Sequence, residues 1–285
     1  MKVDKKRRRI FWQAAGVLCF LIAAIFAGMA GRTWLGYQES EKGLENMYQD
    51  MEHMVLEAES LEAESSQAGD PASLGTENEL RSEESVKTEQ QASRPINVPA
   101  LQKLNSDVAG WIRIPGTVID YPVMHTPEDS NYYFHRDFYK NNSVYGMIYL
   151  DGSCRLDKTT PNLLIYGHHM RNGSMFASIE KYASKDYWRS HPQISLTLSE
   201  DQAEYEVMAA VRLSAGTADE AFIQMLAART EEDYGQLMQY LKEHALYDTG
   251  ITASWPDSLI TLTTCEYTQK DGRFLVVARK ADKES

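Results

Sequence analysis

The chain has 285 residues and a formal net charge of −12, with 43% hydrophobic and 25% charged residues. That length accommodates one or two domains, and the composition is that of an ordinary folded protein. The acidic C-terminal part has no stripe of Lys and Arg, which argues against a nucleic acid as partner because phosphate binding needs clustered positive charge.

The N-terminus combines a basic cluster with a long apolar run. Six of the first nine residues are Lys or Arg, and Ile10 to Ala30 is an apolar stretch of 21 residues in which Gln13 alone is strongly polar. About 20 apolar residues cross a bilayer, and positive charge before the run keeps that side in the cytoplasm. We therefore expect a cytoplasmic tail over residues 1–9, a single transmembrane signal anchor over 10–30 and an extracellular remainder. A cleaved signal peptide is the rival, although its apolar core usually runs about 7 to 15 residues.

The next two segments differ in composition. Apolar residues recur every three or four positions from Leu44 to Leu61, between Glu-rich faces. This is the spacing of an amphipathic helix, which we expect within residues 31–64; whether it dimerises is left open. Residues 65–95 are rich in Ser, Glu, Gln, Gly and Pro and cannot bury enough surface to offset chain entropy. We expect an acidic disordered linker there, which holds the folded domain away from an anionic membrane surface.

Residues 96–285 are predicted to form one folded domain of mostly β structure. Eight short apolar and β-branched segments, separated by turn residues, indicate a barrel or a sandwich. Helices are expected over Val98–Asp107, Met175–Tyr182 and Glu220–His244, and the last insertion is longer than a structural loop, so it is expected to shape a site. The expected strands are Trp111–Ile114, Val118–Val123, Gly146–Asp151, Leu163–Gly167, Ile194–Leu198, Tyr205–Leu213, Leu259–Thr264 and Phe274–Arg279.

The strongest functional signal is Cys265, which ends the apolar run that begins at Leu259. Arg273 precedes the next apolar run, so the two residues are expected to face each other across a hairpin loop. A cysteine at a strand end is often an inert packing residue unless neighbours activate its thiol. The pair therefore needs a base before it indicates catalysis.

Two adjacent histidines supply a candidate base. Leu163 to Gly167 reads as a strand, and His168 and His169 follow it. Adjacent residues of an extended chain point to opposite sides, so only one can share a cleft with Cys265; we choose His168 because Gly167 lets its backbone approach closely. Zinc is the rival explanation, but the histidines lack the ligand spacing of a zinc motif. We expect no metal and no cofactor.

The other extracellular cysteine is Cys154, so a disulfide with Cys265 has to be considered. Cys154 lies in a polar turn beyond a strand end, and a domain of this size is not a small disulfide-dependent scaffold. We expect free thiols whose reactivity depends on their neighbours.

Several of these motifs resemble the sortases, the membrane-anchored cysteine transpeptidases of Gram-positive bacteria. Two segments of the chain look like the catalytic signatures of that family: Thr261 to Cys265 together with Arg273, and Tyr166-Gly167-His168. The segments Trp111–Val123 and Gly146–Asp151, and the long helical insertion before the cysteine, are similar to class B members. The chain departs from class B at two positions, with Thr263 where Ser is frequent and Phe134 where Leu is frequent.

The resemblance implies a closed eight-stranded β-barrel with peripheral helices, and an acyl-transfer mechanism. The Cys265 thiolate would attack the Thr carbonyl of an Asn-Pro-x-Thr-x-like sorting peptide, and His168 would protonate the departing amine. Arg273 would stabilise the oxyanion. An amine of a peptidoglycan precursor or of a pilin would then accept the surface protein. The implied substrate-binding positions are Thr263, Tyr166, Glu266 through its backbone N–H, and Phe134.

Two other functions compete with this one. A cell-wall cysteine peptidase would use the same Cys265 and His168 but transfer the acyl group to water, and would normally orient its histidine with a third polar residue. A non-enzymatic membrane-anchored binding module would explain the anchor and stalk equally well. The acyl acceptor distinguishes the two enzymes, because the peptidase uses water and the transpeptidase uses an amine.

Overall fold

The computed structural model describes residues 96–157, 159–199, 201–213, 220–266 and 272–282, together with scattered helical residues between 28 and 49. The chain divides into two compact units, Met1–Gln49 and Asp50–Ser285. The predicted segments 1–9 and 65–95, and nearly all of 10–30, lie outside the described residues. Within the part of the chain that is described, no helix is both long and apolar enough to cross a membrane.

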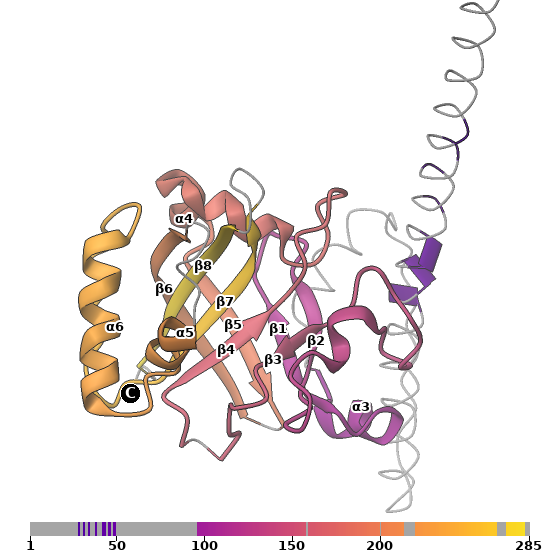
Figure 1. Cartoon of the computed structure of the whole chain (residues 1–285), viewed down its shortest axis with the longest axis horizontal. Coiled ribbons are helices and arrows are strands. Elements are labelled where there is room, and N and C mark those ends of the chain that lie inside the picture. The colour runs from indigo at the N-terminus through magenta and orange to yellow at the C-terminus, as the bar shows by residue number, and fades with distance from the viewer. Residues whose placement is uncertain are drawn as a thin grey trace, which may run out of the picture. The chain divides into compact units, whose positions relative to one another are not determined.

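Eight strands of the second unit close into a barrel in the order β1-β2-β3-β4-β7-β8-β6-β5 (Figure 1). β2 pairs with β3 and β4 with β7 in parallel, and the remaining neighbours are antiparallel. The predicted closed barrel is confirmed. Its strands are β1 (Val108–Arg113), β2 (Asp120–Met124), β3 (Ile148–Leu150), β4 (Asn162–Tyr166), β5 (Gln193–Leu198), β6 (Asp201–Leu213), β7 (Leu259–Glu266) and β8 (Gly272–Lys280).

The burial of β4 explains its sequence. The strand reads Asn-Leu-Leu-Ile-Tyr, and its first four residues are buried. A continuous buried run is typical of a strand with a parallel neighbour and with both faces covered. In this barrel β4 pairs with β7 from Asn162–Leu259 to Tyr166–Thr263, so the parallel pair carries the end of β4 to the same level as the end of β7.

Short helices surround the barrel, and α3 and α6 lie on opposite sides of it (Figure 1). The predicted first helix is shorter than expected, and the second is a 3₁₀ helix shifted by two residues at its start. Two further helices, η1 and α4, were not predicted. The helices are α3 (Val98–Leu104), η1 (Tyr132–His135), η2 (Ala177–Ala183), α4 (Lys185–Ser190), α5 (Glu220–Ala227) and α6 (Glu231–His244).

The predicted single helix over residues 220–244 is wrong, because the insertion forms two helices. Ala228 has a φ of +48°, in the left-handed region that an α-helix cannot continue through. Thr230 then caps α6, since its hydroxyl accepts a hydrogen bond from the Asp233 N–H at 3.1 Å. Three acidic residues in the first turn of α6 further favour a helix start at Glu231.

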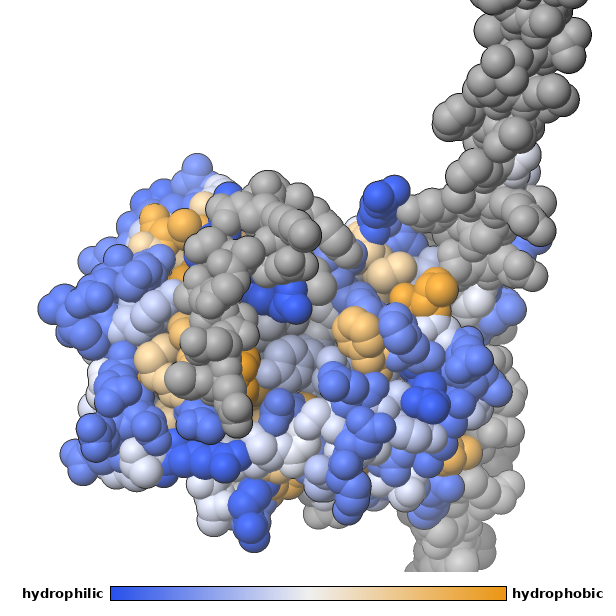
Figure 2. Space-filling view, in the orientation of Figure 1, coloured by the Kyte–Doolittle hydropathy of each residue, from blue (hydrophilic) through white to orange (hydrophobic). Residues whose placement is uncertain are grey.

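The visible surface of the barrel unit is mostly hydrophilic, with small separate hydrophobic groups (Figure 2). Several large apolar side chains that reach solvent come from loops, such as Val118 at 52% and Val144 at 63% exposure, and others come from helices, such as Leu104 of α3. Scattered exposed apolar residues are ordinary on a soluble surface and need no partner to explain them.

Asn162 joins α5 to the barrel. The residue is fully buried, and its side-chain amide donates to the Leu226 carbonyl of α5 at 2.6 Å. The same side chain bonds the Thr261 hydroxyl of β7, with distances of 2.8 and 3.0 Å to its nitrogen and oxygen. One amide therefore fixes the position of α5 over the parallel pair β4–β7.

We predict that Asn162→Ala lowers the free energy of unfolding by about 1–3 kcal/mol, because it leaves buried polar groups without a partner. Urea denaturation of the full chain in detergent measures this loss. The matched control is Asn142→Ala, at an exposed position whose backbone forms an isolated bridge with Arg136. It should change the unfolding free energy by less than about 0.5 kcal/mol. Equal losses in the two variants would contradict the anchoring role of Asn162.

Candidate active site

Three neighbouring strands bring the predicted catalytic positions together. In the barrel order, β4, β7 and β8 are adjacent. Cys265 on β7 pairs with Arg273 on β8, as the predicted hairpin requires. Tyr166, the last residue of β4, pairs with Thr263 on β7. His168, two residues after Tyr166, therefore leaves the sheet at the level of Cys265.

Hydrogen bonds fix the backbone between Tyr166 and His168. The Gly167 N–H donates to the Thr263 carbonyl at 3.1 Å, and the Thr264 hydroxyl donates to the Gly167 carbonyl at 2.8 Å. A Cβ at Gly167 would lie 2.5 Å from Ile148 Cδ1 and 2.6 Å from Phe176 Cγ. Only glycine leaves room for this approach, so the close backbone passage predicted from the sequence is confirmed.

A backbone carbonyl orients the imidazole of His168. Its Nε2 lies 2.6 Å from the Phe134 carbonyl oxygen. A carbonyl oxygen only accepts, so Nε2 carries the hydrogen and Nδ1 is the nitrogen that exchanges a proton. The Phe134 ring packs against the imidazole with centroids 4.3 Å apart, and the His135 ring stacks on it at 5.7 Å. In cysteine peptidases a third polar side chain orients the histidine, and here the Phe134 carbonyl takes that place.

The surroundings of His168 favour its neutral form. Burial lowers the pKa of His168 below its ordinary value of 6.5, and the nearby His135 adds to this effect. The hydrogen bond to the Phe134 carbonyl opposes the shift by stabilising the protonated ring. His168 is therefore neutral over a wider pH range than a free imidazole, and its Nδ1 can accept a proton.

His169 faces a different environment from His168. Its Nε2 lies 2.8 Å from Glu180 Oε2, and Glu180 also approaches Arg212 at 3.8 Å. His169 does not line the cavity that contains His168. The choice between the two adjacent histidines, made from the alternation of an extended chain, agrees with this placement.

A cavity of about 420 Å³ runs beside His168. Its lining includes four further predicted site positions, namely Phe134, Tyr166, Thr263 and Arg273. The side chains of Cys265 and Glu266 lie outside the described residues, although both backbones are placed in β7. The described lining residues are Ser130, Asn131, Phe134, Tyr149, Asp151, Tyr166, Gly167, His168, Ile223, Thr263, Thr264 and Arg273.

Apart from Gly167, whose close backbone passage was predicted, six of the lining residues were not predicted as site positions. Ile223 comes from α5, so the helical insertion contributes a wall as expected. Ser130 and Asn131 precede η1, a helix without a sequence signal of its own. Asp151 is the last residue of the predicted strand Gly146–Asp151, and a polar residue at that strand end was the one available sign. The six are Ser130, Asn131, Tyr149, Asp151, Ile223 and Thr264.

Arg273 gives the cavity its permanent positive charge. Its Nη1 donates to the Gly272 carbonyl at 3.1 Å, which leaves other guanidinium N–H groups for a bound carbonyl or oxyanion. No group of three or more potential ligands that could hold a metal occurs among the described residues. The chemistry available here is that of a strand-end cysteine, an imidazole and a guanidinium.

Cys154 is free and buried. Its sulfur accepts the Leu164 N–H at 3.4 Å, and burial raises the pKa of the Cys154 thiol to about 11. A thiol with so high a pKa is almost entirely protonated at neutral pH and is a poor nucleophile. Cys154 is therefore a packing residue.

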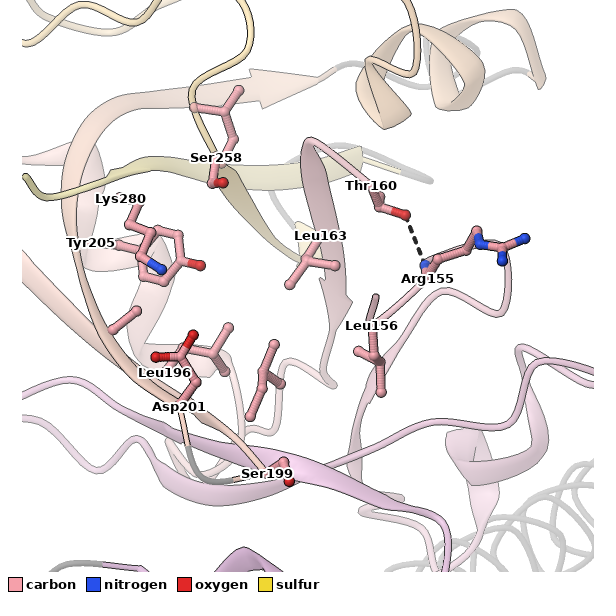
Figure 3. Close-up of a pocket in the computed structure, with 13 residues that line it drawn as sticks. Arg155, Leu156, Thr160, Leu163, Leu196, Ser199, Asp201, Tyr205, Ser258 and Lys280 are labelled. Carbon is pink, nitrogen blue, oxygen red and sulfur yellow. Dashed lines mark hydrogen bonds between the residues drawn. The ribbon is translucent and has the colours of Figure 1, made fainter. Parts of the chain in front are cut away.

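A second cavity, of about 350 Å³, lies at the other end of the barrel (Figure 3). It is lined at the start of β4 and β7 by Leu163 and Leu259, and at the end of β8 by Lys280. Figure 3 shows Tyr205 and Leu163 directed into this space. None of the predicted site residues lines it, so the cavity beside His168 is the candidate active site.

Comparisons with known proteins match the same part of the chain. A family model described as a sortase domain matches residues 112–281. The chain is 34% identical over 186 residues to sortase B of Listeria monocytogenes, covering 64% of this chain and 73% of that protein. It is 27% identical over 182 residues to sortase B of Staphylococcus aureus, covering 63% and 72%. The X-ray structure of Clostridium perfringens sortase B has a TM-score of 0.59 and 28% identity, covering 65% of this chain and 99% of that one.

We predict that His168 titrates below pH 6.5, because burial disfavours its charged form. NMR titration of the chain labelled at histidine measures this pKa. His135→Asn should move the pKa of His168 upward, since it removes a neighbouring group that is positive when protonated. A His168 pKa at or above 6.5 in the unmodified chain would contradict the described environment.

Proposed function

Because the chain belongs to the class B sortases, a group of cysteine transpeptidases, we propose that Cys265, His168 and Arg273 are its nucleophile, its acid–base group and its oxyanion stabiliser. The pairing of Cys265 with Arg273 across β7 and β8 is the observation that carries this assignment. The end of β4, which leads to His168, lies on the other side of β7. The nucleophile therefore sits on a strand between the strands of its two partners.

The first half of the reaction forms a thioester. The Cys265 thiolate attacks the Thr carbonyl carbon of a sorting peptide, and the developing oxyanion is stabilised by Arg273 with help from the Glu266 backbone N–H. The C–N bond after Thr breaks, and protonated His168 gives its proton to the departing amine. The Phe134 carbonyl holds the imidazole through Nε2, so Nδ1 delivers the proton.

The second half transfers the acyl group to an amine. Neutral His168 takes a proton from the incoming amine as it attacks the thioester, and the Cys265 thiolate leaves. An amide bond replaces the thioester, and the enzyme returns to its starting protonation state. We propose a peptidoglycan precursor or pilin amine as acceptor, and an Asn-Pro-x-Thr-x-like peptide as donor, both on the basis of the family.

The groove beside His168 is the proposed site of the sorting peptide. Thr263 and Tyr166 form part of the cavity floor at the ends of β7 and β4, while Phe134 and Ile223 contribute apolar walls from η1 and α5. Apolar walls with a few polar groups are typical of a peptide-binding groove. Phe134 in place of the frequent Leu enlarges the aromatic surface next to His168.

We predict that Arg273→Lys lowers kcat/KM for peptide cleavage more than tenfold, because an ammonium cannot reproduce the planar, multiple hydrogen bonds of a guanidinium. A purified assay with an Asn-Pro-x-Thr-x peptide and an amine acceptor measures this loss, with Cys265→Ala as the inactive reference. Arg279→Lys is the matched control on the same strand. Arg279 pairs with Glu206 at 3.2 Å, does not line the cavity, and should retain activity.

A loss below tenfold for Arg273→Lys would show that the geometry of the guanidinium does not matter. Cleavage by Cys265→Ala would overturn the nucleophile assignment altogether. Transfer to water even with excess amine present would instead identify the chain as a peptidase.

The proposed setting is a single-pass membrane protein with an extracellular barrel. Residues 1–9 form the cytoplasmic basic tail, 10–30 the anchor, 31–64 a juxtamembrane helix and 65–95 the linker. The charge before the apolar run supports this orientation. The folded domain of residues 96–285 then works outside the membrane.

Protease added to intact protoplasts should cut residues 65–95 and release the barrel domain, because we place the linker outside the cell. Immunoblotting of the supernatant with an antibody to the barrel measures the release. A tag at the N-terminus should stay protected until the membrane is permeabilised. A protected barrel together with a digested N-terminal tag would mean that the orientation is reversed.

A further inference from the structure

Asp151 is the one carboxylate among the described residues that line the active-site cavity. It follows directly after β3 and is partly buried. The mechanism above uses the imidazole of His168 and the guanidinium of Arg273 but leaves this negative charge without a role. A charge enclosed with Phe134 and Ile223 is costly unless it binds a donor.

Neighbouring groups hold the Asp151 carboxylate in place. Its Oδ1 accepts the Ser153 N–H at 2.9 Å, and the Tyr166 hydroxyl lies close enough for the carboxylate to add to the rise that burial causes in the Tyr166 pKa. Burial raises the pKa of Tyr166, so its hydroxyl keeps its proton and acts as the donor. An ionised carboxylate offers about four acceptor positions. The Ser153 N–H and the nearby Tyr166 hydroxyl therefore leave capacity for a donor from a substrate.

The register of the sheet places Asp151 well away from the bond that is cleaved. The Asp151 N–H donates to the Leu164 carbonyl at 2.9 Å, and Leu164 pairs with Thr261 on β7. Thr261 lies four residues before Cys265 on that strand. At about 3.3 Å per residue, Asp151 is roughly 13 Å from the level of the nucleophile.

A peptide bound along this cavity reaches Asp151 with a residue remote from the scissile bond. An extended chain covers roughly 13 Å in about four residues, and the reach of two side chains shortens the count to three or four. The acyl part of the substrate remains attached to Cys265 after the amine has left, so it is the part that the groove has to hold. The donor peptide is therefore a better occupant for this end than the transient acceptor.

We propose that Asp151 is a specificity-determining residue that binds an N–H donor side chain of the sorting peptide, three or four residues before the cleaved bond, and rejects a carboxylate there. The proposal rests on the proposed function. The donor class includes a primary amide and an ammonium group. The Asn of the Asn-Pro-x-Thr-x motif stands three residues before Thr and belongs to this class.

The test compares two peptides that differ only at that position, Asn in one and the nearly isosteric Asp in the other. The full chain in detergent and its Asp151→Asn variant are assayed for kcat/KM of thioester formation. Asn at 151 can still accept the Ser153 N–H and the Tyr166 hydroxyl, so the fold is kept while the charge is removed. Asp157→Asn is the matched control, because Asp157 is exposed and pairs with Arg155 outside this cavity.

We expect the unmodified chain and Asp157→Asn to prefer the Asn peptide by at least a hundredfold, and Asp151→Asn to reduce this preference at least tenfold. An unchanged preference in Asp151→Asn overturns the inference about Asp151 alone. An equal loss on both peptides also overturns it, because the residue would then support the site without selecting the substrate. If the unmodified chain cleaves neither peptide, the proposed donor motif fails and the inference falls with it.

Discussion

The active site depends on the parallel pairing of β4 with β7. Two hydrogen bonds join Gly167 to Thr263 and Thr264 at 3.1 and 2.8 Å, and the missing side chain of Gly167 lets Ile148 and Phe176 close over it. This contact sets the height at which the chain leaves β4. On its other side β7 pairs with β8. His168, Cys265 and Arg273 therefore lie next to one another, in this order, at the same end of the barrel.

Elements outside the sheet complete the site. η1 supplies the Phe134 carbonyl that orients His168, and α5 supplies Ile223 as a wall of the groove. Asn162 ties α5 to the same pair of strands. The resulting cavity carries a guanidinium next to Cys265, the proposed nucleophile, and a carboxylate toward its far end. This separation of charge is the basis of our proposal that Arg273 stabilises the transition state and that Asp151 selects the peptide.

The sequence predicts those parts of the site that depend on strand periodicity. Runs of apolar and β-branched residues locate the strands of Cys265 and Arg273 and the strand that leads to His168. The alternation of an extended chain distinguishes His168 from His169. Contacts between residues far apart in the sequence produce no periodic pattern, so the sequence does not predict them. The Phe134 carbonyl reaches His168 across 34 residues, and Asp151 enters the groove only through its register with Leu164. The helix break at Ala228 depends on the backbone conformation of one residue. The helical pattern of residues 220–244 continues through Ala228 and therefore did not predict the break.

The most direct test of this account is to map the acyl-enzyme. The full chain is incubated with an Asn-Pro-x-Thr-x peptide, quenched in acid and digested, and the modified residue is identified by mass spectrometry. We predict an adduct ending in Thr on Cys265, which disappears when an amine acceptor is added and yields a new amide product. An adduct on Cys154, or cleavage of the peptide with Cys265 unmodified throughout, would contradict the assignment.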